Sequence, residues 1–147
     1  MYQRILIATD GSQLSKNAMT QGIALAKETG ATVVGFHAIL PSPVLYYADP
    51  TPMPASTIEA FERDAEMMGA KYIAAIERAC AKAGVPFIGV TTRVSAPAEA
   101  IIRMAKKEKC DLIVMVSHGR KGIKRLLLGS ETNAVLTHSQ IPVLVTR

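Results

Sequence analysis

The stretch "DLIVMV" at residues 111–116 is the clearest indication of the fold, because every residue after the aspartate is apolar. A strand with one solvated face alternates between apolar and polar residues, whereas a strand covered by helices on both faces is a continuous apolar run. Such strands are typical of parallel sheets. The run therefore predicts a central strand of a parallel sheet with helices on both sides.

Strand-like and helix-like segments alternate outward from this run along the whole chain. Short apolar runs rich in β-branched residues predict four more strands, at residues 4–9, 32–39, 86–94 and 141–146. Helices are predicted between them, mostly from apolar residues at three- and four-residue steps, at residues 14–28, 57–83, 96–107 and 130–138. This alternation predicts a single α/β domain over residues 1–147, with a doubly wound, Rossmann-like, five-stranded parallel sheet.

The first strand is expected at the centre of the sheet, which leads to the strand order 3-2-1-4-5. The segment at residues 86–94 alternates and contains Thr and Arg, so we place it at an exposed edge. An apolar face runs along the longest helix from Ile58 to Ala83. On this pattern Met67 and Met68, like Met104 in the next helix, are expected to fill the core.

Composition excludes several classes of protein. The chain has 147 residues, of which 49% are hydrophobic and 20% charged. No apolar run approaches the ~20 residues of a membrane-spanning helix, and the N-terminus lacks the pattern of a signal peptide, so we expect a cytoplasmic protein without a membrane partner. Cys80 and Cys110 lie far apart and outside any metal-ligand spacing, which predicts two reduced, partly buried thiols and no metal site.

The charge favours anionic partners without choosing among them. The net charge is +5 and the isoelectric point about 9.4, which suits a nucleotide or a nucleic acid. A chain with no Trp, four Tyr and three Phe offers little for a base-stacking platform on single strands. No helix-turn-helix, zinc or RNA-binding signature is present, so these observations argue against nucleic acid.

Two candidate binding loops are expected to face each other at one end of the sheet. In open parallel sheets, ligands bind beyond the carboxyl ends of the strands, where strand order reverses. With the first strand central, that crevice lies between strands one and four, beside "TDGS" (9–12) and "SHGRKGIKRLLLGSET" (117–132). A proline-rich segment at residues 41–56 leaves strand two beside the same crevice, either as a lid over a ligand or as a surface excursion.

The second loop ends in Gly129 and Ser130, directly before a predicted helix. Unpaired main-chain N–H groups and the helix dipole favour a phosphate at such a start, and hydroxyl groups can add hydrogen bonds. Plain N-capping of the helix by Ser130 would use the same residues. Four basic residues of the loop would either attract anions or form a solvated face: Arg120, Lys121, Lys124 and Arg125.

Over its full length the chain resembles the universal stress protein family in its single-domain, nucleotide-binding form. The phosphate motif of that family is a Gly, two residues, a Gly, nine residues, then Gly-Ser or Gly-Thr; Gly119, nine residues and Gly129-Ser130 match its second part. The segments "ILIATDGS" (5–12), "FHAI" (36–39) and "IPVLV" (141–145) match as well. Val116 stands where the first glycine of the motif is expected, and a β-branched residue disfavours positive φ.

The resemblance implies an adenine nucleotide alpha hydrolase-like fold that binds ATP or AMP, with or without Mg²⁺. Asp10, with Thr9 beside it, would contact the ribose or base, although it could instead cap the turn before the first helix. Ala38 would offer main-chain groups to adenine. His118 would flank the phosphates, unless it is a loop histidine bonded to main chain. The phosphates would lie among the residues of the motif: Val116, Gly119, Gly129, Ser130 and Glu131.

We therefore expect an adenine-nucleotide-binding, stress-response regulatory protein rather than an enzyme. No general base with a supporting partner and no carboxylate pair for Mg²⁺ is evident, so any ATP hydrolysis would be slow. Val116 favours an alternative, a nucleotide-independent protein-interaction module of the same fold. The C-terminal strand, Ile141 to Arg147, has no charge before its last residue, which predicts a homodimer through this sheet edge, as the resemblance also implies.

Overall fold

The computed structural model describes residues 1–41, 53–118 and 128–147 of the chain. Strands and helices alternate in this part of the chain as predicted. Several sequence predictions lie outside the described residues: Gly119, the four basic residues of its loop, and most of the proline-rich segment at 41–56.

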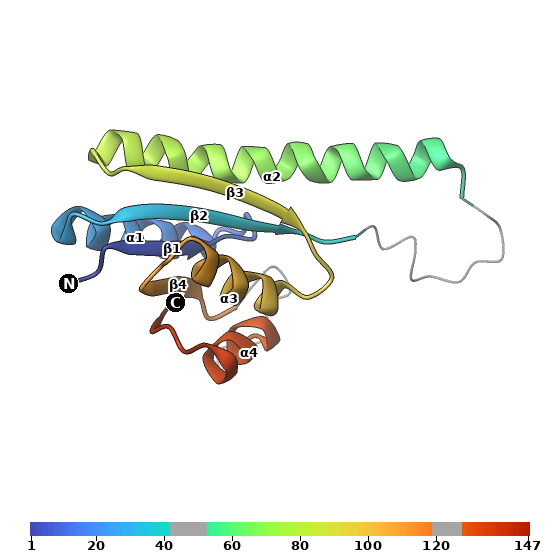
Figure 1. The fold of residues 1–147 in the computed structure, drawn as a ribbon. Coiled ribbons are helices and arrows are strands. Elements are labelled where there is room, and N and C mark those ends of the chain that lie inside the picture. Colours follow the sequence, from blue (N-terminus) through green and yellow to red (C-terminus); the bar gives the residue numbers. More distant parts are fainter. Residues whose placement is uncertain (42–52, 119–127) are drawn as a thin grey trace.

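The described strands form one parallel sheet in the order β3-β2-β1-β4-β5 (Figure 1). They are β1 (Arg4–Ala8), β2 (Thr32–Ile39), β3 (Phe87–Arg93), β4 (Leu112–Val116) and β5 (Val143–Thr146). The central strand β1 pairs with β2 on one side and with β4 on the other. This order confirms the predicted fold and places the reversal of strand order between β1 and β4.

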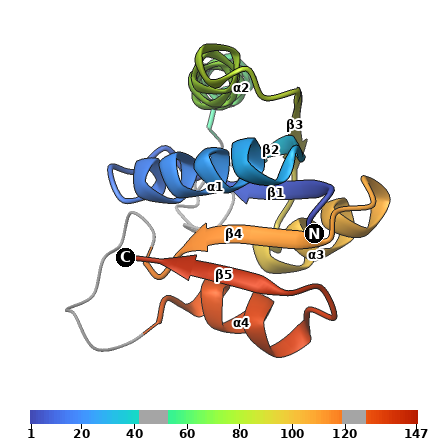
Figure 2. The same cartoon turned by 90° about the vertical axis from the view of Figure 1, so that its left-hand side faces the viewer.

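Helices cover both faces of the sheet (Figure 2). The helices α1 (Ser15–Thr29) and α2 (Ala55–Ala83) lie on one face, and α3 (Pro97–Lys107) and α4 (Ser130–His138) lie on the other. Because successive strand residues point to opposite faces, Ile5 and Ile7 pack in one core with α1 and α2, whereas Leu6 packs in a second core with α3 and α4. Every residue of β4 is buried, as its continuous apolar run predicts, and β3 alternates at the edge.

Helix α2 extends beyond the end of the sheet (Figure 1). Its 29 residues span about 44 Å, whereas the eight residues of β2 span about 26 Å. The buried residues of α2 accordingly lie from Gly69 onward. The prediction that Met67 and Met68 fill the core is therefore wrong, since they are 68% and 44% exposed, while Met104 is buried as expected.

Both cysteines are free and buried, one in each core. Cys80 packs with α1 and α2, and Cys110 packs with α3 and α4. Burial raises the pKa of each thiol to about 11, so that both remain protonated at neutral pH. They behave as small apolar side chains, in agreement with the sequence prediction.

Candidate functional site

The turn after β1 is held by its own side chains at the carboxyl end of the sheet. Thr9 Oγ1 accepts a hydrogen bond from Gly11 N at 3.1 Å, and Asp10 Oδ1 accepts one from Ser12 N at 2.9 Å. His37 Nδ1, on β2, donates to Thr9 O at 2.9 Å, because a carbonyl oxygen can only accept. One oxygen of Asp10 thus caps the turn, which is one of the two roles considered for it, and this contact fixes its orientation.

Gly11 is the most closely packed point of this turn. Its φ of 75° lies in the left-handed region that favours glycine. A Cβ at this position would enter the ring of Tyr72 on α2. Tyr72 also packs edge-on against His37, with ring centroids 5.1 Å apart. The turn after β1 and helix α2 are therefore packed directly against each other.

Two hydrogen bonds join the end of β4 to the start of α4. Gly129 N donates to Ser117 O at 2.7 Å, and the buried Thr132 Oγ1 donates to Val116 O at 2.8 Å. Gly129 holds the N-cap position and Ser130 is the first residue of the helix, so N-capping by Ser130 is not what the structure shows. Because glycine has no side chain, it cannot cap the first N–H groups of the helix.

At this end of the sheet, Gly129 and Val116 contribute main chain rather than a side chain. The φ of Gly129 is −59°, which every residue can adopt, so its conformation does not require glycine. The lack of a Cβ instead leaves room beside the main chain. Val116 is the last residue of β4, and its buried side chain packs in the core with α1 and α2. That core, and not the loop, accommodates the branched side chain.

Glu131 and His118 have structural partners of their own. Glu131 Oε2 accepts a hydrogen bond from Ala98 N at 2.8 Å, in the first turn of α3, where the helix dipole favours a carboxylate. His118 Nδ1 shares a hydrogen bond of 2.9 Å with Ser117 Oγ, a side chain rather than main chain. Its Nε2 is buried and has no partner among the residues that the structure describes.

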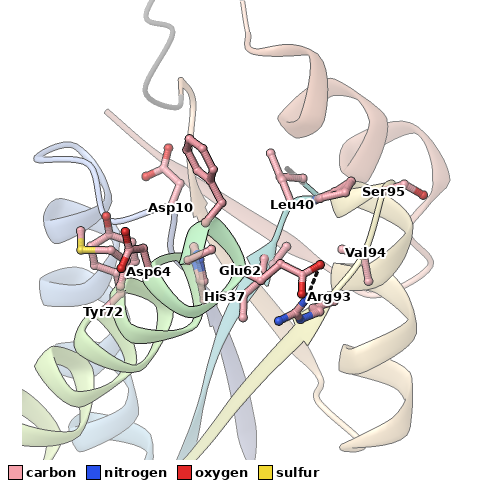
Figure 3. Close-up of a pocket in the computed structure, with 15 residues that line it drawn as sticks. Asp10, His37, Leu40, Glu62, Asp64, Tyr72, Arg93, Val94 and Ser95 are labelled. Carbon is pink, nitrogen blue, oxygen red and sulfur yellow. Dashed lines mark ion pairs between the residues drawn. The ribbon is translucent and has the colours of Figure 1, made fainter. Parts of the chain in front are cut away.

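A cleft of about 690 Å³ opens at the ends of β1, β2 and β3, beneath α2 (Figure 3). Asp10, which follows β1, and Ala38, which lies in β2, both line this cleft. Figure 3 shows Asp10 on the side of Tyr72 and Arg93 on the opposite side, with the cleft between them. One wall of the cleft comes from Phe61, Ala65 and Met68, in the half of α2 that extends beyond the sheet, and from Tyr72, further along the same helix.

An ion-pair cluster ties this half of α2 to β3 (Figure 3). Arg93 Nη1 lies 3.2 Å from Glu62 Oε1, and Arg93 Nη2 lies 2.5 Å from Glu66 Oε1. Hydrogen bonds to Glu66 and then to Glu62 raise the pKa of Arg93 above its usual value. All three side chains are largely exposed, so the cluster adds little to stability, but it restrains the helix relative to the strand.

The structure brings some of the predicted site residues together and assigns others to local contacts. Asp10 and Ala38 meet at the cleft, while Gly129 and Ser130 lie at the start of α4. The sequence analysis missed the contribution of α2 and of Arg93. One signal was available: the predicted helix at residues 57–83 is longer than the strands that it covers, so part of its apolar stripe had to lie beyond the sheet.

Residues 1–41, 53–118 and 128–147 show neither a metal centre nor a membrane-spanning helix. No group of three or more His, Cys, Asp or Glu side chains in these ranges is arranged to hold a metal ion. No helix in the same part of the chain is both long and apolar enough to cross a membrane.

Known proteins resemble the chain in both sequence and structure. The model of the universal stress protein family matches residues 1–147. A universal stress protein of Thermus aquaticus, from the QAH/OAS sulfhydrylase 3' region, is 36% identical over all of both chains. Universal stress protein MJ0531 of Methanocaldococcus jannaschii is 32% identical over all of this chain and 83% of its own. The solved structure of MJ0577 from the same organism has a TM-score of 0.83 at 26% identity, with 99% of this chain and 96% of that one covered.

Three other solved structures with this fold hold a nucleotide. They are a universal stress protein in complex with cAMP, that of Archaeoglobus fulgidus in complex with dAMP, and that of Arabidopsis thaliana with AMP bound. Their TM-scores are 0.73, 0.63 and 0.69, at identities of 22%, 20% and 15%. These matches cover at least 97% of this chain and 90% of the other, and at such identities they show a shared fold.

Proposed function

Because the chain belongs to the universal stress protein family, we propose that it binds an adenine nucleotide, ATP or AMP, at the carboxyl ends of its strands. One observation carries the proposal. Asp10 and Ala38 come from separate strand ends, were selected from the sequence as ribose and adenine contacts, and line the same cleft. The nucleotides held by three solved proteins of this fold support the proposal.

The charges around the cleft suit the base and ribose rather than the phosphates. Among the residues that the structure describes, three carboxylates line it, those of Asp10, Glu62 and Asp64, against one guanidinium, that of Arg93. This excess of negative charge repels phosphate. Asp10 can accept hydrogen bonds from ribose hydroxyls, and the main chain at Ala38 can pair with adenine. The nucleotide would therefore lie with its base under α2 and its phosphates toward α4.

The start of α4 suits the phosphates. Its first N–H groups precede the helical bond from Asn133 N to Gly129 O, and the helix dipole adds positive potential there. Gly129 leaves room for a phosphate beside the main chain, and the exposed Ser130 can donate from its hydroxyl. Mg²⁺ bound to the phosphates of ATP would neutralise part of their charge at this end.

The proposed role is that of a cytoplasmic regulatory protein of the stress response, with at most slow ATP hydrolysis. Asp10 and Glu131 are the acidic candidates that the sequence places near the crevice. The described contacts use one oxygen of Asp10 for Ser12 N and one of Glu131 for Ala98 N. A carboxylate held in this way is poorly placed to act as a general base toward water.

Calorimetry tests the nucleotide proposal. Wild-type protein, stripped of bound ligand, should release heat on titration with ATP and Mg²⁺, and denaturing freshly purified protein should release an adenine nucleotide. Absence of both signals would favour the second candidate, a nucleotide-independent interaction module. Val116 is the observation that favours this candidate, because a branched residue replaces the first glycine of the phosphate motif.

We also propose that the protein forms a homodimer through the outer edge of β5. Ile113 N donates to Pro142 O, and Ser117 N donates to Thr146 O. Alternate residues of a strand present their N–H and C=O groups in the same direction, so Val143 and Val145 present theirs to the open edge. Natural sheets blunt such edges with charge or cover, and pairing with a second copy across a two-fold axis satisfies the same groups.

Replacing Val145 by proline should shift the dimer toward monomer. Proline removes the outward N–H of this residue without breaking the ladder to β4. Sedimentation velocity at micromolar concentration should show a dimer for the wild type and a smaller species for the variant. The control Val145→Thr keeps both the shape and the N–H, so it should remain dimeric. A wild-type monomer at high concentration would rule out this interface.

A further inference from the structure

The overhanging half of α2, residues 55–68, has an apolar stripe that belongs to neither of the two cores formed by the described residues. In residues 55–68 no side chain is buried, yet Ile58, Phe61, Ala65 and Met68 recur at helical steps. Three of them, Phe61, Ala65 and Met68, line the cleft. In a helix segment that faces only solvent, these positions would be polar. A ligand in the cleft would therefore bury apolar side chains of this stripe.

Phe61 is the most distinctive member of this stripe. It is 47% exposed, whereas Phe36 on the central part of β2 is 1% exposed. An aromatic ring left in water forgoes the apolar burial that it gains in a core or against a ligand. Ile39, Leu40 and Val94, at the ends of β2 and β3, also line the cleft. The cleft therefore has apolar side chains both from α2 and from the strand ends.

Three contacts hold the stripe in place above the strand ends. Arg93 on β3 pairs with Glu62 and Glu66 on α2, on the turns of the helix that carry Phe61 and Met68. Further along the helix, Tyr72 packs against the turn at Gly11. The stripe is thus anchored on both the β1 side and the β3 side of the cleft, so its side chains need little ordering when a ligand enters.

We propose that Phe61 stacks on the purine base of the bound nucleotide and is the main source of base affinity in this site. The inference rests on the proposed function and adds to it a residue from α2 that binds the base through its ring. Any aromatic base can stack on a phenyl ring. A purine has a larger surface than a pyrimidine, so it gains more favourable stacking energy. Asp10 at the ribose and the main chain at Ala38 then orient the nucleotide.

The first test compares Phe61→Ala with a control on the same helix. Alanine removes the stacking ring, so the dissociation constant for AMP should rise by about 5- to 150-fold. Met67→Ala removes a side chain that is 68% exposed and is not part of the cleft lining, so it should leave the affinity unchanged. Thermal unfolding without ligand should differ little between Phe61→Ala and wild type. A clear loss of stability with unchanged AMP affinity would show that Phe61 packs on its own chain, and would overturn the inference.

A second test reads the stacking directly, because the chain contains no tryptophan. Phe61→Trp introduces a single indole that should keep the affinity for AMP and be quenched when the base stacks on it. Met67→Trp serves as the matched control and should keep its emission. Calorimetric binding of AMP to Phe61→Trp without quenching would overturn the stacking role while leaving the proposed function intact. Absence of AMP binding by the wild type would instead overturn both.

Discussion

Replacing Gly11 by alanine will lower the free energy of unfolding by about 2 to 5 kcal/mol. Two effects add. The φ of 75° places this residue in the left-handed region, which costs a residue with a Cβ about 1 to 2 kcal/mol. The new methyl group would also enter the ring of Tyr72, and overpacking of this kind costs about 1 to 3 kcal/mol. Urea unfolding followed by circular dichroism measures the sum.

Gly30 separates these two effects. Its φ is 71°, close to that of Gly11, but a Cβ there would meet nothing within 4 Å. Gly30→Ala should therefore cost only the backbone strain, about 1 to 2 kcal/mol. In a Tyr72→Ala background, Gly11→Ala should fall to the same value, since the ring is gone. Equal losses for Gly11→Ala and Gly30→Ala in the wild-type background would mean that the ring of Tyr72 moves aside without cost, and would contradict the overpacking effect.

Replacing Ser130 by alanine will weaken ATP binding about 10- to 150-fold, if the phosphates lie at the start of α4. A hydrogen bond to a charged group contributes about 1.5 to 3 kcal/mol, which corresponds to this range of affinity. Ser130 is the first residue of α4 and does not cap it, so its removal should leave the stability of the helix nearly unchanged. Calorimetric titration with ATP measures the effect.

Adenosine and a second helix variant serve as controls for this result. Adenosine has no phosphate, so its affinity should be the same for Ser130→Ala and wild type. Thr137→Ala removes a hydroxyl in the last turn of the same helix, where it donates to Asn133 O, and should leave ATP affinity unchanged. An equal loss for ATP and adenosine would place Ser130 away from the phosphates.

Most of the fold could be predicted from the sequence because the local pattern of apolar residues indicates how a strand is buried. The run at residues 112–116 is continuously apolar and lies fully buried beside the central strand. The run at residues 87–93 alternates and lies at the edge. Both outcomes follow from the side-chain period of a strand and from the number of faces that helices cover. The predicted strand order depended on placing the first strand at the centre of the sheet, which the structure confirms.

The wrong predictions concern the positions at which helices end relative to their neighbours. Met68 lies on the apolar stripe of α2, but this part of the helix extends beyond the sheet, and Met67 lies off that stripe. Periodicity shows which side of a helix is apolar and does not show whether anything faces that side. Ser130 was considered as an N-cap, yet Gly129 takes that position, because caps depend on one or two residues and local dihedral angles.

By itself, the sequence determined the parallel α/β fold and the loops at the reversal of strand order, which depend on local patterns and on chain order. Asp10 and Ala38 became candidates for one site through the family resemblance that the sequence carries. Only the tertiary structure decided that α2 forms a wall of the cleft, that Arg93 ties this wall to β3, and that Glu131 bonds to the start of α3. Such contacts join residues about 27 to 33 positions apart. These contacts depend on the lengths of the elements and on how they pack, and a local sequence pattern does not reveal either.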